Sequence, residues 1–157
     1  MIFRKEKIEG KFIKIAQEHE VVMQYIDKLK NISKQPAEKK MAQLHELWPA
    51  FQSDMKHHYK IEERFLFPAA LLTMPSIELI DMMLTLQKEH GYSERDMARM
   101  KALLDSQTVD TASVSQLLGT MIQDLEEHAR IEMEQLFPQM DKNKKCRELI
   151  RGILLES

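Results

Sequence analysis

Two stretches of the chain repeat one arrangement of ionisable and apolar residues. HHYKIEERFLFP at residues 57–68 and HARIEMEQLFP at residues 128–138 share His, Ile, Glu, Leu, Phe and Pro at equal offsets. In each, a histidine precedes a glutamate by four residues, His58 before Glu62 and His128 before Glu132, so both side chains project from one helix face. Both pairs fall within apolar patterns, where an uncompensated carboxylate is costly. The repeat therefore requires a common partner for buried charge.

Apolar residues recur at spacings of three and four along four segments, which predicts four amphipathic helices. The four stripes are Ile8, Phe12, Ile15, His19, Val22, Ile26 and Leu29; Leu44, Trp48, Phe51, Met55, His58, Glu62 and Phe65; Leu79, Met83, Leu86, His90, Glu94, Met97 and Leu104; and Val114, Leu118, Met121, Leu125, His128, Glu132 and Leu136. Pro68 and Pro138 are predicted to end the second and fourth helices. Cys146 to Leu155 is predicted as a possible short fifth helix.

Local signals predict where the helices begin. A breaker stretch that ends at Pro36 separates the first two stripes, and Pro49 should kink the second helix or start its main part. Ser76, after Pro75, has the character of an N-cap for the third helix. Ser113 and Gln116 have the spacing of a capping box for the fourth.

The histidines can be placed by a simple test. In an antiparallel pair, residues at one height have a sequence midpoint inside the connecting turn. The midpoints of His19 and His58, His58 and His90, and His90 and His128 are 38.5, 74 and 109, and all three fall in or beside predicted turns. The sequence therefore predicts an all-α, up-down-up-down antiparallel four-helix bundle with four histidines at nearly one level.

Composition narrows the class of protein further. The chain has 157 residues, which favours one domain over residues 1–157, and its net charge of -2 argues against nucleic-acid or membrane partners. A single cysteine, Cys146, fits a reducing compartment. The first residues, MIFRKEKIEGKF, lack the apolar run of a signal peptide, and no later run approaches the roughly 20 residues of a membrane span. We expect a soluble, cytoplasmic protein.

A metal cation is the partner that best explains the polar layer. Taken singly, each histidine is more simply a core imidazole bonded to a neighbour. Together, four histidines and two glutamates are too many ligands for one ordinary zinc site, whereas two metal ions bridged by Glu62 and Glu132 account for every member. Iron and manganese accept this donor set, and zinc in one position is also compatible with it.

This layer, with Leu-Phe-Pro closing both His-Glu pairs, resembles the hemerythrin-like HHE cation-binding domain over about residues 8 to 140. The resemblance implies two iron ions in a non-haem di-iron centre. Glu62 and Glu132 would bridge the ions, His19 and His58 would bind one, and His90 and His128 the other. Hemerythrins have a further histidine one turn beyond the position of His90, where this chain has Glu94. Glu94 is thus a seventh candidate ligand, an outer group, or a residue that faces away.

The resemblance implies binding of dioxygen, peroxide or nitric oxide for carriage, storage or sensing. Two alternatives are a redox enzyme, which turns over peroxide or nitric oxide or donates iron as iron-sulfur repair proteins do, and a metal-dependent interaction module. The repair proteins usually carry an added cysteine-containing N-terminal segment that we do not expect here, which weighs against the enzyme. The protein partner of an interaction module is not indicated.

Several ionisable residues near the pairs lie off the stripes. His57 is one residue away from the second stripe, about 100° around the helix, and His45 lies beside Leu44. Neither is expected to bind metal. Four glutamates are likewise predicted to lie on a solvated face: Glu63, Glu89, Glu127 and Glu134.

Overall fold

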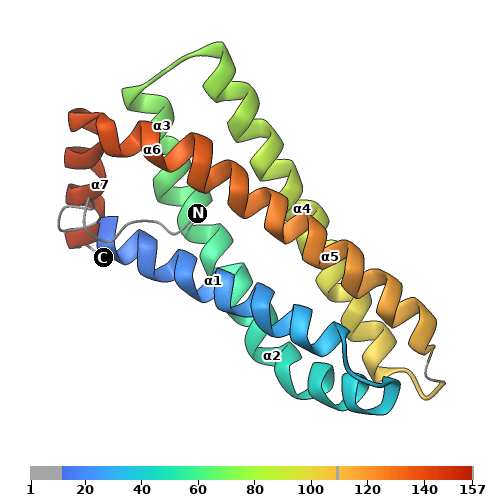
Figure 1. Cartoon of the computed structure of the whole chain (residues 1–157). Coiled ribbons are helices and arrows are strands. Elements are labelled where there is room, and N and C mark those ends of the chain that lie inside the picture. Colours follow the sequence, from blue (N-terminus) through green and yellow to red (C-terminus); the bar gives the residue numbers. More distant parts are fainter. Residues whose placement is uncertain (1–11, 109, 157) are drawn as a thin grey trace.

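Four long helices run side by side as an elongated bundle in the computed structural model (Figure 1). They are α1 (Phe12–Ser33), α2 (Ala37–Ile61), α4 (Ile77–Asp105) and α5 (Thr111–Ile131). Both α1 and α4 pack against α2 and α5, so the four helices surround one central axis. The all-α bundle predicted from the sequence is confirmed.

The structure describes the backbone of residues 12–108 and 110–156 and the side chains of residues 19–108 and 110–152. Of the first predicted stripe, Ile8 and the side chains of Phe12 and Ile15 lie outside these described parts. The remaining members, His19, Val22, Ile26 and Leu29, are all buried. No strand occurs in the described backbone.

The second and fourth helices do not end at their prolines, and this prediction was wrong. A π-helical turn, η2 (Glu62–Leu66) or η3 (Glu132–Leu136), follows each helix and leads into α3 (Phe67–Thr73) or α6 (Phe137–Lys142). Pro68 and Pro138 lie in the first turn of these following helices. A proline has no N–H and its ring clashes with the preceding helical turn, and a wider turn just before it accommodates both restrictions.

The π-turns also change which apolar residue is buried. The backbone N–H of Phe67 donates to the carbonyl of Glu62, five residues back, and Phe137 does the same to Glu132. As a result Leu66 is fully buried, whereas Phe65, which we assigned to the stripe, is only half-buried. Leu136 is buried as predicted.

The helix starts agree only in part with the sequence signals. The hydroxyl of Ser76 accepts a hydrogen bond from the N–H of Leu79 at 3.1 Å, which confirms this cap. In α5 the N-cap is Asp110, whose carboxylate accepts a hydrogen bond from the N–H of Ser113 at 3.1 Å. The predicted capping box of Ser113 and Gln116 was therefore wrong. Helix α2 continues through Pro49. The predicted fifth helix is α7 (Lys144–Glu156).

Two apolar cores lie on either side of the predicted polar layer. One joins α1, α2 and α5 to the C-terminal half of α4, and includes Trp48, Phe51 and Met100. The other joins the opposite half of α4 to α3, α6 and α7, and includes Leu86 and Phe137. Figure 1 shows α3, α6 and α7 gathered at one end of the bundle. The layer between the cores is therefore held away from water on two sides.

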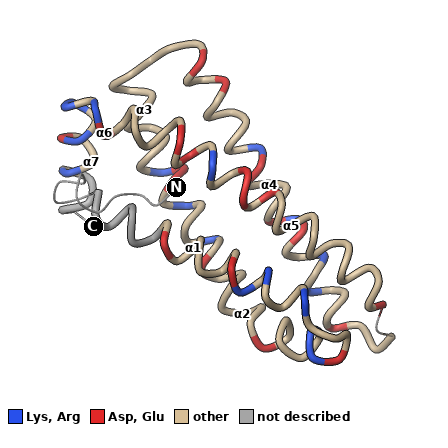
Figure 2. Tube along the Cα trace, viewed as in Figure 1, with Lys and Arg blue, Asp and Glu red and all other residues tan. Residues whose placement is uncertain are grey.

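The outer surface is mixed in charge. Acidic and basic residues are interspersed along the helices (Figure 2). Within the described residues, no helix combines the length and the apolar character needed to cross a membrane.

Candidate metal centre

Six ionisable side chains are buried in the middle of the bundle. Each of these residues as a whole is at most 7% exposed. Every long helix supplies at least one of them: His19 from α1, His58 and Glu62 from α2 and η2, His90 from α4, and His128 and Glu132 from α5 and η3. These are the six predicted members other than Glu94. Their convergence confirms that the four histidines share one level.

The Nε2 atoms of the histidines face the carboxylates. Nε2 of His90 is 3.0 Å from Oε2 of Glu62, and Nε2 of His58 contacts Oε1 of the same glutamate. Nε2 of His19 and Nε2 of His128 are 3.3 and 3.2 Å from Oε1 of Glu132. The ring nitrogens of four helices therefore point at two carboxylates in the centre.

These atoms form two overlapping groups in which the donor atoms lie within 4.8 Å of one another. The first group contains His19, His58, Glu62 and Glu132, and the second contains Glu62, His90 and His128. Glu62 belongs to both. Glu132 belongs to the first and also contacts His128 of the second. Each group has the donors to hold a metal ion.

The local charges oppose the cost of burial. Burial alone would raise the pKa of Glu62, but contact with His58, His128 and His90 lowers this pKa well below its ordinary value. Burial would lower the pKa of His128, yet Glu132, Glu62 and Glu89 raise it well above 6.5. The carboxylates and imidazoles of the site thus stabilise one another's charges, and a metal ion would compete with protons for the imidazole nitrogens.

Two observations show that the residues fit a bound cation. Oε2 of Glu132 is buried and has no hydrogen-bond partner among the described residues. Nε2 of His90 and Nε2 of His128 lie only 3.1 Å apart. Two imidazole nitrogens that each bind one metal ion at about 2.1 Å lie about 3.0 Å apart in an octahedral arrangement and about 3.4 Å apart in a tetrahedral one. The geometry and the donor chemistry therefore agree.

Glu94 lies outside this arrangement. Its side chain is exposed, and it belongs to neither group of donors. Helix α4 has no π-turn after its histidine, so its buried face passes from His90 through half-buried Ser93 to Met97. Glu94 is rotated away from that face. Of the three possibilities open for it, the structure places it facing away.

The structure adds two residues that the sequence analysis assigned to solvent. Oε1 of Glu63 is 2.9 Å from Nδ1 of His90, and Oε2 of Glu89 is 2.7 Å from Nδ1 of His128. Both glutamates are partly exposed to solvent, as predicted, but their carboxylates also bind buried histidines, which the sequence analysis did not predict. Each hydrogen bond crosses from one helix to another, so the pattern along a single helix held no signal for it.

The other off-stripe residues lie at the surface as predicted. Glu127 and Glu134 are exposed and bind the guanidinium of Arg130. His57 is exposed, and His45 is 64% exposed beside Asp105.

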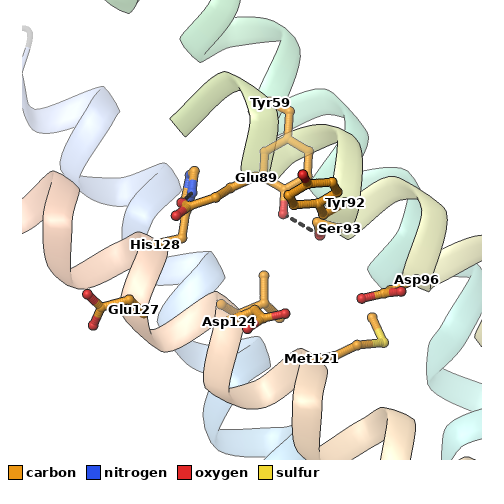
Figure 3. A pocket seen from close by; sticks show the side chains of 10 residues that line it. Tyr59, Glu89, Tyr92, Ser93, Asp96, Met121, Asp124, Glu127 and His128 are labelled. Atoms are coloured by element: carbon orange, nitrogen blue, oxygen red, sulfur yellow. Dashed lines mark hydrogen bonds and ion pairs between the residues drawn. The ribbon is translucent and has the colours of Figure 1, made fainter. Parts of the chain in front are cut away.

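Tyr59 forms one wall of the layer. Its ring stacks on that of His90, with centroids 4.0 Å apart, and its buried hydroxyl lies 2.7 Å from the hydroxyl of Ser93 (Figure 3). Burial raises the pKa of this phenol well above 10. The uncharged ring of Tyr59 therefore covers one face of the His90 ring.

Two small cavities reach the layer from different sides. One of about 240 Å³ lies between α4 and α5 and touches Tyr59, Glu89 and His128 (Figure 3). Asp96 and Asp124 line it as well, and burial together with Asp96 and Glu89 raises the pKa of Asp124.

The second cavity, of about 230 Å³, lies between α1 and α2 and reaches His58. Its lining has fewer acidic residues than that of the first cavity and includes Val21, Val22 and Met55. Beside them the hydroxyl of Tyr25 donates to Asp54. The layer can thus be approached from two sides, and the α4–α5 side is the more acidic of the two.

A buried His-Glu layer across an antiparallel four-helix bundle defines a class of cation-binding helical proteins. Comparison with protein families gives a match to the hemerythrin HHE cation-binding domain over residues 13–140. The chain belongs to this family, and its domain is a metal-binding one. Comparison with curated proteins and with solved structures gave no match.

Proposed function

We propose that this domain holds two iron ions as a non-haem di-iron centre. Glu62 and Glu132 would lie between the two metal positions, with His19 and His58 at one and His90 and His128 at the other. The observation that carries the proposal is the pair of overlapping donor groups, which share Glu62 and are joined again by the contact of Glu132 with His128. Nitrogen and carboxylate donors in this ratio suit iron, and manganese is the nearest alternative.

The proposed ligand for the loaded centre is a small molecule: dioxygen, nitric oxide or peroxide. An iron pair supplies redox chemistry and coordination positions that such a ligand can occupy. The cavities of about 240 and 230 Å³ that reach His128 and His58 are smaller than most pockets for larger organic ligands. Their size favours a diatomic or similarly small ligand.

The protein's own residues control access and orientation. Burial of the six polar side chains between two apolar cores excludes bulk water from the layer. The stacked ring of Tyr59 limits movement of His90. On the α1–α2 side the cavity has one acidic residue, Asp54, against four on the other side, which favours an uncharged ligand there. Carriage, storage or sensing therefore fits the surroundings of the site.

Absorption spectroscopy of iron-loaded protein tests the proposal. Reduced protein should develop a charge-transfer band on exposure to dioxygen, lose it under vacuum, and show a different band with azide. Rapid irreversible oxidation without a reversible band would contradict carriage. Repeated consumption of peroxide without loss of iron would instead assign redox catalysis to the same centre.

A further inference from the structure

The outward nitrogens of two histidines are bound by carboxylates from neighbouring helices. Glu63, on η2, reaches Nδ1 of His90 on α4 at 2.9 Å, and Glu89, on α4, reaches Nδ1 of His128 on α5 at 2.7 Å. The histidines are 2% and 9% exposed at their side chains, whereas Glu63 and Glu89 are 38% and 31% exposed. Each glutamate therefore connects a buried ring with the surface.

This contact fixes which nitrogen of each ring carries a hydrogen. An ionised carboxylate only accepts hydrogen bonds, so Nδ1 must donate. In a neutral ring the lone pair is then on Nε2, the atom that faces Glu62 and Glu132 in the centre. A carboxylate behind a metal-binding histidine also sets the ring's orientation and makes it a stronger donor.

The same support is missing from His19 in the other donor group. Nδ1 of His19 is buried and has no hydrogen-bond partner among the described residues. The ring is held by Glu132 on its inward side and by edge contact with Phe137, whose ring centroid is 5.1 Å away. The two donor groups are therefore unequal in their surroundings, although their ligand types are alike.

We propose that Glu63 and Glu89 are positioning residues that make the two metal positions unequal. The position served by His90 and His128 binds its ion first and more tightly than the position served by His19 and His58. This inference rests on the proposed two-metal centre. Glu63 and Glu89 act through the histidines and do not themselves bind the ion.

Stepwise titration with Fe²⁺ under anaerobic conditions tests the order of binding. Wild-type protein should bind two ions with separable affinities. Glu63→Ala and Glu89→Ala should weaken the tighter step by about 10–100-fold and leave the weaker step within about twofold. Glu63→Gln and Glu89→Gln, which keep an acceptor oxygen, should lose less. Glu94→Gln, on the exposed side of α4, is the matched control and should bind as wild type does.

Nitrogen NMR of zinc-loaded protein measures the Nδ1–H signals of individual histidines, which a general loss of stability would not remove selectively. Wild-type protein should show hydrogen-bonded Nδ1–H signals from His90 and His128, and Glu89→Ala should remove only that of His128. Equal weakening of both steps, or unchanged affinities in both alanine variants, would overturn the inference. Failure of wild-type protein to bind two ions would instead overturn the proposed function.

Discussion

At the scale of single residues, the site depends on carboxylates that would be unstable alone. Glu62 is completely buried and meets His58, His90 and His128, while one oxygen of Glu132 has no partner among the described residues. A bound divalent cation compensates such charge more completely than the imidazoles alone do. The two glutamates should therefore be more important for metal binding than any other acidic residue of the chain.

Replacement of Glu132 tests this distinction. Glu132→Gln removes the charge and keeps the volume, so metal content should fall to about one ion per chain or less. Glu94→Gln should keep the wild-type metal content because Glu94 is exposed and lies outside both donor groups. Elemental analysis of both variants checks the prediction, and equal metal content in the two would refute it.

The raised pKa of His128 predicts how pH acts on the metal-free and loaded forms. In metal-free protein, protonated His128 contributes stability that is complete below the unfolded pKa of 6.5 and is lost as pH rises through the raised folded pKa. A bound metal requires the nitrogen without its proton, so the loaded protein has no such contribution to lose as pH rises. The Tm difference between the two forms should therefore widen above about pH 6.5.

Acid acts in the opposite sense through Glu62. Its lowered pKa contributes stability above the ordinary value of 4.5, and that stability is lost as pH falls through the folded pKa. Thermal melts of both forms across pH test the two effects together. A Tm difference that stays constant on both sides of pH 6.5 would count against the assigned contacts of His128.

At the scale of helical elements, the structure depends on where each helix begins and how it passes its proline. The hydroxyl of Ser76 and the carboxylate of Asp110 satisfy backbone N–H groups at the starts of α4 and α5. The π-turns η2 and η3 begin at Glu62 and Glu132 themselves. The two carboxylates are therefore placed by an irregularity of the helix, a common feature of functional sites.

Asp110 and Gln116 give a direct test of the cap of α5. Asp110→Ala should lower the free energy of unfolding clearly, because the N–H of Ser113 loses its acceptor. Gln116→Ala, which would break the capping box expected from sequence, should change it by less than about 0.5 kcal/mol. Urea denaturation of the metal-free variants distinguishes the two caps. A larger loss from Gln116→Ala would show that the assignment is wrong.

Helical periodicity predicted the buried histidines because each histidine lies on the same face of its helix as the apolar residues around it. The midpoints then predicted their common height. Phe65 was misplaced because periodicity assumes a regular helix, and η2 adds a wider turn after Glu62. Glu63 and Glu89 were missed for a different reason. Their partners, His90 and His128, lie on other helices. The rotation of one helix about its axis relative to its neighbour cannot be predicted from the sequence of either helix alone.

At the scale of the whole molecule, the metal layer joins all four long helices between two separate apolar cores. A metal ion that binds only the folded state stabilises it by mass action, by about 2.7 kcal/mol when its free concentration is 100 times its Kd. Removal of metal should therefore loosen the contact between the cores as well as empty the centre.

Chelation provides the measurement of this coupling. Metal-free protein should melt several degrees below loaded protein, because about 1 kcal/mol corresponds to roughly 2–4 °C for a domain of this size. Hydrogen exchange should increase most in the turns of α1, α2, α4 and α5 around the six polar residues. An unchanged Tm after complete metal removal would exclude a metal-dependent interaction switch and would weaken the two-metal account.

The number of ions per chain tests the central claim most directly. Protein loaded anaerobically with Fe²⁺, freed of loosely bound ions by gel filtration and submitted to elemental analysis, should retain about two ions per chain, because the donors form two overlapping groups. The double variant Glu62→Gln with Glu132→Gln should retain almost none. Wild-type protein that retains one ion or fewer per chain would contradict the account.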